Sequence, residues 1–72
     1  MKVTLNGKQT EIEAKTILDL LQSRKVEPQM VSVELNEKVL DRADFAKTPL
    51  HEGDKIELHY FMGGGASTGL AL

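Results

Sequence analysis

The hairpin signal at the start of the chain constrains the fold most strongly. Polar and apolar side chains alternate over residues 2–6, as in a strand with one buried face. Asn6-Gly7 follows, and this pair favours a tight turn because both of its central positions need a positive φ. The alternation resumes over residues 9–14, so the sequence predicts an antiparallel hairpin. Two strands cannot cover their own apolar face, and the remaining chain must do so.

The next segment has the pattern of an amphipathic helix. Its apolar stripe comprises Ile17, Leu18, Leu20 and Leu21. Thr16 is the predicted N-cap, and Asp19 completes a weaker form of the capping box. We predict about three turns, with Arg24 and Lys25 in the last turn, where cations suit the helix dipole. Pro28 closes the segment.

Three more strands are predicted after the helix. They span residues 31–35, 38–40 and 55–60. Asn36-Glu37 is a tight turn, and residues 42–47 form an irregular or single-turn helical link anchored by Phe45. The final strand alternates cleanly. Its predicted core-facing residues are Ile56, Leu58 and Tyr60.

This order of elements predicts an α+β fold. A right-handed crossover would place the last strand parallel to the first, in the middle of the sheet. The result is a β-grasp, or ubiquitin-like, roll with a mixed sheet of four to five strands packed on one helix. With 72 residues and 40% apolar composition, the chain supports one modest core without disulfides. We expect this domain to span residues 1–60.

Residues 61–65 are the expected flexible tail. Gly63, Gly64 and Gly65 contribute no packing area and lose the most conformational entropy on ordering. A narrow backbone that threads into another protein's active site explains such a run, whereas an inert linker is the alternative. Phe61 and Met62 precede it as predicted partner contacts, although Phe61 could instead cap the core edge.

Composition argues against several classes of function. Nine Lys and Arg stand against eleven Asp and Glu, for a net charge of −2, and no basic stripe predicts nucleic-acid binding. No apolar run suits a membrane span and no leader is seen, so we expect a cytoplasmic protein that is monomeric when free. No nucleophile–base arrangement is visible, so we do not expect an enzyme.

The two histidines, His51 and His59, are read as isolated from one another and from any metal or acid–base pair. His59 is expected on the sheet face away from the helix, either solvated or at a partner interface. Strand alternation displays Glu57 outward as well, without a catalytic carboxylate partner.

Several features occur together in residues 1–65: the β-grasp order, the strand and turn at 31–36, Arg42, the segment 52–54 and the glycine end. In this combination the chain resembles the ThiS family of sulfur carriers in thiamine biosynthesis. The resemblance implies an activating enzyme, similar to ubiquitin-activating enzymes, that adenylates the glycine carboxylate with ATP. A persulfide then supplies sulfur, and the resulting thiocarboxylate donates it to thiazole synthase. The chain itself would bind no cofactor.

When residues are counted without gaps from Asp54 against the family pattern, the terminal Gly-Gly pair falls at Gly64 and Gly65. This places the acyl residue at Gly65, with Gly64 as the alternative. Gly63 and Gly64 would thread the activating enzyme. Residues 66–72 depart from the family pattern. We expect a processing peptidase to remove them, whereas an artificial or vestigial tail is the alternative. Carriers for a sulfur amino acid or for molybdopterin, and a plain ubiquitin-like interaction module, remain competing hypotheses.

Overall fold

The chain begins with the predicted hairpin. In the computed structural model, which describes residues 1–61, the hairpin consists of β1 (Lys2–Leu5) and β2 (Lys8–Glu11). The turn residues Asn6 and Gly7 have φ values of 50° and 83°. The Asn-Gly turn prediction is therefore confirmed, since both residues take up the positive φ that such a turn requires.

The second strand is shorter than predicted. It ends at Glu11 instead of continuing to residue 14, because its neighbour β1 begins at Lys2 and offers no further strand to pair with. Ile12 still exchanges two backbone hydrogen bonds with Met1, at 2.8 and 2.9 Å. The chain then leaves the sheet, and the Ile12 side chain turns into the core.

Helix α1 (Ile17–Ser23) begins where the sequence predicts. The Thr16 hydroxyl accepts a hydrogen bond from the backbone N–H of Asp19 at 3.1 Å, which confirms the N-cap. The Asp19 carboxylate accepts a bond of 3.4 Å from the N–H of Lys15, one residue before the cap residue that a capping box would use.

The helix ends earlier than predicted. Its 7 residues make about two turns, not three. Arg24 is the C-cap and Lys25 has a φ of 59°, so both cations lie beyond the last turn. The predicted placement of these cations in the last turn is wrong, because the left-handed conformation of Lys25 ends the helix.

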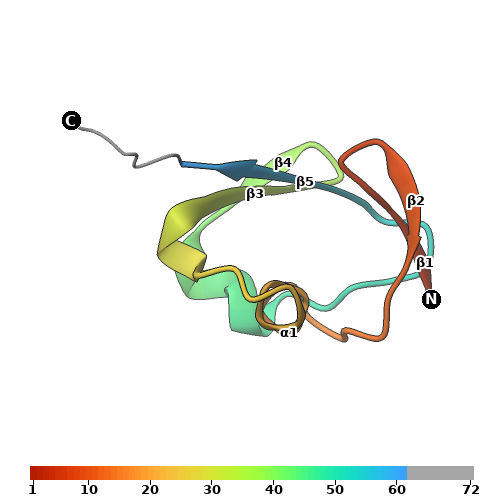
Figure 1. Cartoon of the computed structure of the whole chain (residues 1–72), viewed down its shortest axis with the longest axis horizontal. Coiled ribbons are helices and arrows are strands. Elements are labelled where there is room, and N and C mark those ends of the chain that lie inside the picture. Colours follow the sequence, from red (N-terminus) through yellow and green to blue (C-terminus); the bar gives the residue numbers. More distant parts are fainter. Residues whose placement is uncertain (62–72) are drawn as a thin grey trace.

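The five strands form one mixed sheet in the order β2-β1-β5-β3-β4. The second half of the sheet consists of β3 (Val31–Leu35), β4 (Lys38–Leu40) and β5 (Lys55–Tyr60). β5 is parallel to β1 and antiparallel to β3, in the centre of the sheet. Figure 1 shows the sheet on one side and α1 on the other, which confirms the β-grasp arrangement.

Two short 3₁₀ helices complete the layer that faces the sheet, η1 (Pro28–Met30) and η2 (Arg42–Lys47). Phe45 of η2 is buried, as predicted for the anchor of this link. Within residues 1–61, no helix has the length and apolar character that a bilayer crossing requires.

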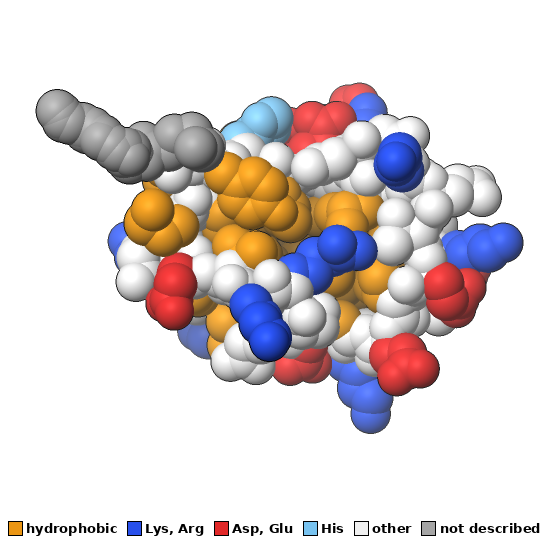
Figure 2. Space-filling model, viewed as in Figure 1, with side chains coloured by type: hydrophobic (Ala, Val, Ile, Leu, Met, Phe, Trp, Pro, Cys, Tyr) orange, Lys and Arg blue, Asp and Glu red, His pale blue; other side chains and the backbone are white. Residues whose placement is uncertain are grey.

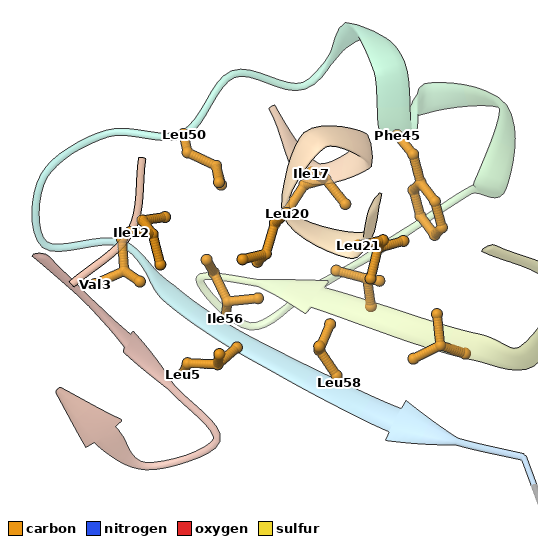
Figure 3. Packing of buried hydrophobic residues seen from close by; sticks show 12 residues of the cluster. Val3, Leu5, Ile12, Ile17, Leu20, Leu21, Phe45, Leu50, Ile56 and Leu58 are labelled. Atoms are coloured by element: carbon orange, nitrogen blue, oxygen red, sulfur yellow. The ribbon is translucent and has the colours of Figure 1, made fainter. Parts of the chain in front are cut away.

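The core lies between the sheet and the helical layer, and Figure 3 shows α1 side chains pointing at those of β5. Its fully buried members are Ile17, Leu20, Leu21, Ile56, Val3 and Val33. Tyr60 does not belong to it: half of its surface is exposed, so its predicted core position is wrong. The short α1 packs over the middle of β5, and Tyr60 stands at the end of the strand.

Candidate docking surface at the end of the central strand

β5 carries the chain from the centre of the sheet toward the glycines. Its last ladder pair joins Val31 to Tyr60, and the backbone N–H of Phe61 then donates to the carbonyl of Met30 at 2.9 Å. The chain is therefore held to its neighbour up to Phe61. Of the predicted site residues, Met62 and the glycines at 63–65 lie outside the described residues.

Three exposed apolar side chains gather at this end of the sheet. Met30, Tyr60 and Phe61 expose 42%, 50% and 55% of their surface, and we call them the exit patch. The backbones of Met30 and Phe61 are joined by a hydrogen bond, and Tyr60 immediately precedes Phe61, so the three residues lie at the same end of the sheet. Figure 2 shows hydrophobic side chains at the surface beside the point where the described chain ends. Clustered apolar surface of this kind is typical of sites that bind other proteins.

The sequence anticipated only part of this patch. Phe61 was expected either to contact partners or to cap the core edge, and its exposure suits the first interpretation. The alternation assigns Tyr60 to the core, and no pattern in the sequence singles out Met30. Met30 can be recognised as a neighbour of Phe61 only once the register between β3 and β5 is known. No single-sequence pattern encodes that register.

A second cluster lies on the outer face of the sheet. Glu34 of β3 stands directly opposite Glu57 of β5, and His59 follows two residues later on the same face. The His59 Nε2 atom lies 3.7 Å from a carboxylate oxygen of each glutamate. The outward position of His59 is confirmed, but its predicted isolation is wrong. The sequence separates Glu34 from His59, and strand pairing brings them together.

His51 sits elsewhere, at the turn that precedes β5. Its Nδ1 atom lies 3.9 Å from a carboxylate oxygen of Asp54, and its side chain is mostly exposed. His51 therefore pairs with Asp54, whereas His59 pairs with Glu34 and Glu57. The two histidines belong to different clusters, in agreement with the prediction that they do not form a pair.

The segment 52–54 and the turn at Asn36 together fix the start of β5. Gly53 has a φ of 86°, a conformation that side chains rarely adopt. The Asp54 carboxylate accepts hydrogen bonds from the His51 backbone N–H and from the Asn36 side-chain amide, at 2.8 and 3.0 Å. Asn36 in turn accepts the Lys55 backbone N–H at 2.9 Å. Asn36, Gly53 and Asp54 belong to the segments on which the family resemblance rests. Their role in this structure is to hold the start of β5 in place.

Comparison with known proteins places this architecture in a family. The model of the ThiS family matches residues 3–65. The chain is 36% identical over 63 residues to the sulfur carrier protein ThiS of Thermus thermophilus, covering 88% of this chain and 98% of the relative. A crystal structure of the thiamine biosynthesis protein ThiS from Geobacter metallireducens is 40% identical, with a TM-score of 0.76, and the match covers 90% of this chain and 100% of that one.

Longer relatives also match. The chain is 41% identical over 66 residues to a thiazole synthase of Magnetococcus marinus, covering 90% of this chain. It spans about a fifth of the length of that protein and of a similar thiazole synthase from Paramagnetospirillum magneticum, 20% and 21% respectively. With the family model covering nearly the whole β-grasp domain and the glycine run, the chain belongs to the ThiS family.

Proposed function

We propose that this chain is a sulfur carrier for thiazole formation in thiamine biosynthesis and that Gly65 carries the sulfur. One observation carries the proposal: the match to the ThiS family runs through the β-grasp domain and ends at Gly65, the last of three consecutive glycines. Membership of the family accounts for the fold and for the tail together. A folded domain has no packing reason to end its last strand in glycines.

The proposed chemistry takes place on the Gly65 carboxylate. An activating enzyme that resembles ubiquitin-activating enzymes joins a carboxylate oxygen to the α-phosphorus of ATP, and pyrophosphate leaves. A persulfide sulfur then attacks the acyl carbon, and AMP leaves. A thiol reduces the resulting acyl disulfide and releases the glycyl thiocarboxylate. Glycine suits both steps because the missing Cβ leaves the acyl carbon open to attack.

In this scheme the chain is a cosubstrate and not a catalyst. Sulfur resides on the chain end because the sequence contains no cysteine that could hold it on a side chain. Thiazole synthase is the proposed acceptor. Two relatives with that name contain a segment similar to this chain, which supports a functional link between carrier and acceptor.

Residues 66–72 must be removed for this chemistry. In the present sequence the Gly65 carbonyl is joined to Ala66 by a peptide bond, so it is not a free carboxylate. We propose that a peptidase cuts between these two residues. Mass spectrometry of the protein isolated from its native host should show a chain that ends at Gly65. A stable product that retains residues 66–72 would contradict processing.

The exit patch is the proposed docking surface for the activating enzyme and the acceptor. The exit patch lies at the end of the strand from which the tail departs. An enzyme that binds this patch therefore has its active site within reach of the tail. Aromatic and methionine side chains are enriched at such interfaces because they bury large areas and adapt to different partners.

The test compares the full chain with a version that ends at Gly65. Each is incubated with the activating enzyme, ATP, a persulfide donor and a thiol, and intact mass is measured. We expect the shortened chain to gain the mass of one oxygen-to-sulfur exchange and the full chain to remain unchanged. If the shortened chain gains no sulfur with any activating enzyme tested, the plain ubiquitin-like interaction module becomes the better explanation.

A further inference from the structure

The outer face of the sheet holds a group of potential metal ligands that the proposed sulfur chemistry does not use. Glu34, Glu57 and His59 each offer one ligand atom, and these atoms all lie within 4.8 Å of one another. We propose that these three side chains bind a Zn²⁺ ion. The proposal concerns this face alone and does not depend on the sulfur-carrier function.

The sheet register holds the three side chains together. Glu34 and Glu57 are directly opposed on the antiparallel strands β3 and β5, and His59 lies two residues along β5. Side chains at positions i and i+2 of a strand point to the same face. Leu58, between the two β5 ligands, points into the core, which fixes the opposite orientation of its neighbours (Figure 3).

The distances suit a small ion with tetrahedral coordination. The His59 Nε2 atom lies 3.7 Å from Glu34 Oε2 and 3.7 Å from Glu57 Oε1. Ligand atoms around tetrahedral Zn²⁺ are about 3.3–3.6 Å apart, given bond lengths of about 2.0–2.2 Å. Because all three ligand atoms already lie within 4.8 Å of one another on exposed or half-buried side chains, side-chain rotations would bring them to these distances.

The local charge also favours a cation. Like charges directly opposite each other on paired strands are destabilising, and Glu34 and Glu57 form such a pair. Within residues 1–61, the ion-pair partner of each is His59, which is a cation only when protonated. Lys55 is on the same face, but its Nζ atom lies 3.4 Å from Glu37. A divalent ion would neutralise both carboxylates.

The donor set and the exposure indicate the type of ion. One imidazole nitrogen with two carboxylate oxygens suits Zn²⁺ and related transition metals, whereas Mg²⁺ and Ca²⁺ prefer oxygen ligands alone. His59 is 54% exposed and each glutamate 36%, so water can take the fourth position. Such an ion would tie β3 to β5 two residues before Phe61.

Isothermal titration calorimetry of the untagged full chain with ZnCl₂ tests the proposal directly. We expect one ion per chain, with the affinity reduced at least about tenfold by His59→Ala and by Glu34→Gln, since each removes one of three ligands. Two matched controls remove the other histidine or a neighbouring glutamate, His51→Ala and Glu37→Gln. Both should leave the affinity unchanged.

An NMR titration of the native chain keeps the test independent of any variant. The imidazole nitrogen resonances of His59 should shift at one equivalent of Zn²⁺ while those of His51 stay in place. Mg²⁺ at the same concentration should neither shift them nor displace Zn²⁺. The proposal is overturned by a lack of saturable Zn²⁺ binding, by equal losses in the His51 and His59 variants, or by competition from Mg²⁺ as effective as Zn²⁺.

Discussion

The side-chain oxygen of Asn6 accepts a hydrogen bond of 2.8 Å from the backbone N–H of Leu58. Strand β1 pairs with β5 only as far as Leu5 and Ile56, after which the chain turns at Asn6. The next N–H of β5 on that side, that of Leu58, would then lack a strand partner. The asparagine side chain supplies the missing acceptor and extends the ladder by one bond beyond the end of β1.

Asn36 has the same role on the other side of β5. It too lies in a hairpin turn with a φ of 50°, and its side-chain oxygen accepts the backbone N–H of Lys55 at 2.9 Å. Both hairpins of the sheet are thus fastened to the central strand through a turn asparagine. That strand is the one that leads to the glycine tail.

Asn6→Gly should destabilise the domain by about 1–3 kcal/mol, because glycine accepts the positive φ but leaves the Leu58 N–H without its acceptor. The measurement is urea unfolding, in which the midpoint should fall without a change in slope. Asn6→Asp retains an acceptor oxygen and should cost less than half as much. Equal losses in the two variants would show that the hydrogen bond is not the cause.

Leu21→Ala should reduce the free energy of unfolding by about 2–5 kcal/mol, because Leu21 is fully buried between α1 and the sheet. A domain of this size has only about 4–11 kcal/mol to lose. The matched control is Leu18→Ala on the same helix, where the leucine is only partly buried. Thermal unfolding followed by circular dichroism should show a smaller fall in midpoint temperature for Leu18→Ala than for Leu21→Ala.

Phe61→Ala should weaken binding to the activating enzyme at least tenfold, about 1.4 kcal/mol, if the exit patch is the docking surface. Surface plasmon resonance measures the dissociation constant. The free energy of unfolding should change by less than about 0.5 kcal/mol, since Phe61 is exposed. Val39→Ala removes another exposed apolar side chain, from β4, and should leave binding intact. Similar effects of both variants would argue against a localised patch.

Gly64→Val, in a chain that ends at Gly65, should slow thiocarboxylate formation by about a hundredfold, because a branched side chain displaces the acyl group from its reactive position. Gly64→Ala should have an intermediate effect. The readout is the rate of sulfur incorporation by intact mass. Since the substitution lies beyond β5, urea unfolding should be unchanged. A valine variant that takes up sulfur at the normal rate would refute the narrow-tail explanation.

Local sequence patterns determined the elements of this fold. Asn6-Gly7 specified a turn through its backbone preference, and the Thr16 cap with its apolar stripe specified where the helix begins. Alternation then located the strands. Because a right-handed crossover leaves few ways to cover a hairpin with one helix, these elements also implied the β-grasp order.

Only the tertiary structure decided which distant residues share a surface. The register of β3 against β5 places Met30 beside Phe61 and Glu34 beside His59, and each pair is separated by many residues of chain. Tyr60, the last residue of β5, is half exposed, although its alternation predicted burial. Periodicity indicates which face of a strand a side chain occupies. The register between strands, and the burial of a side chain by other elements, depend on contacts that form only when the whole sheet assembles.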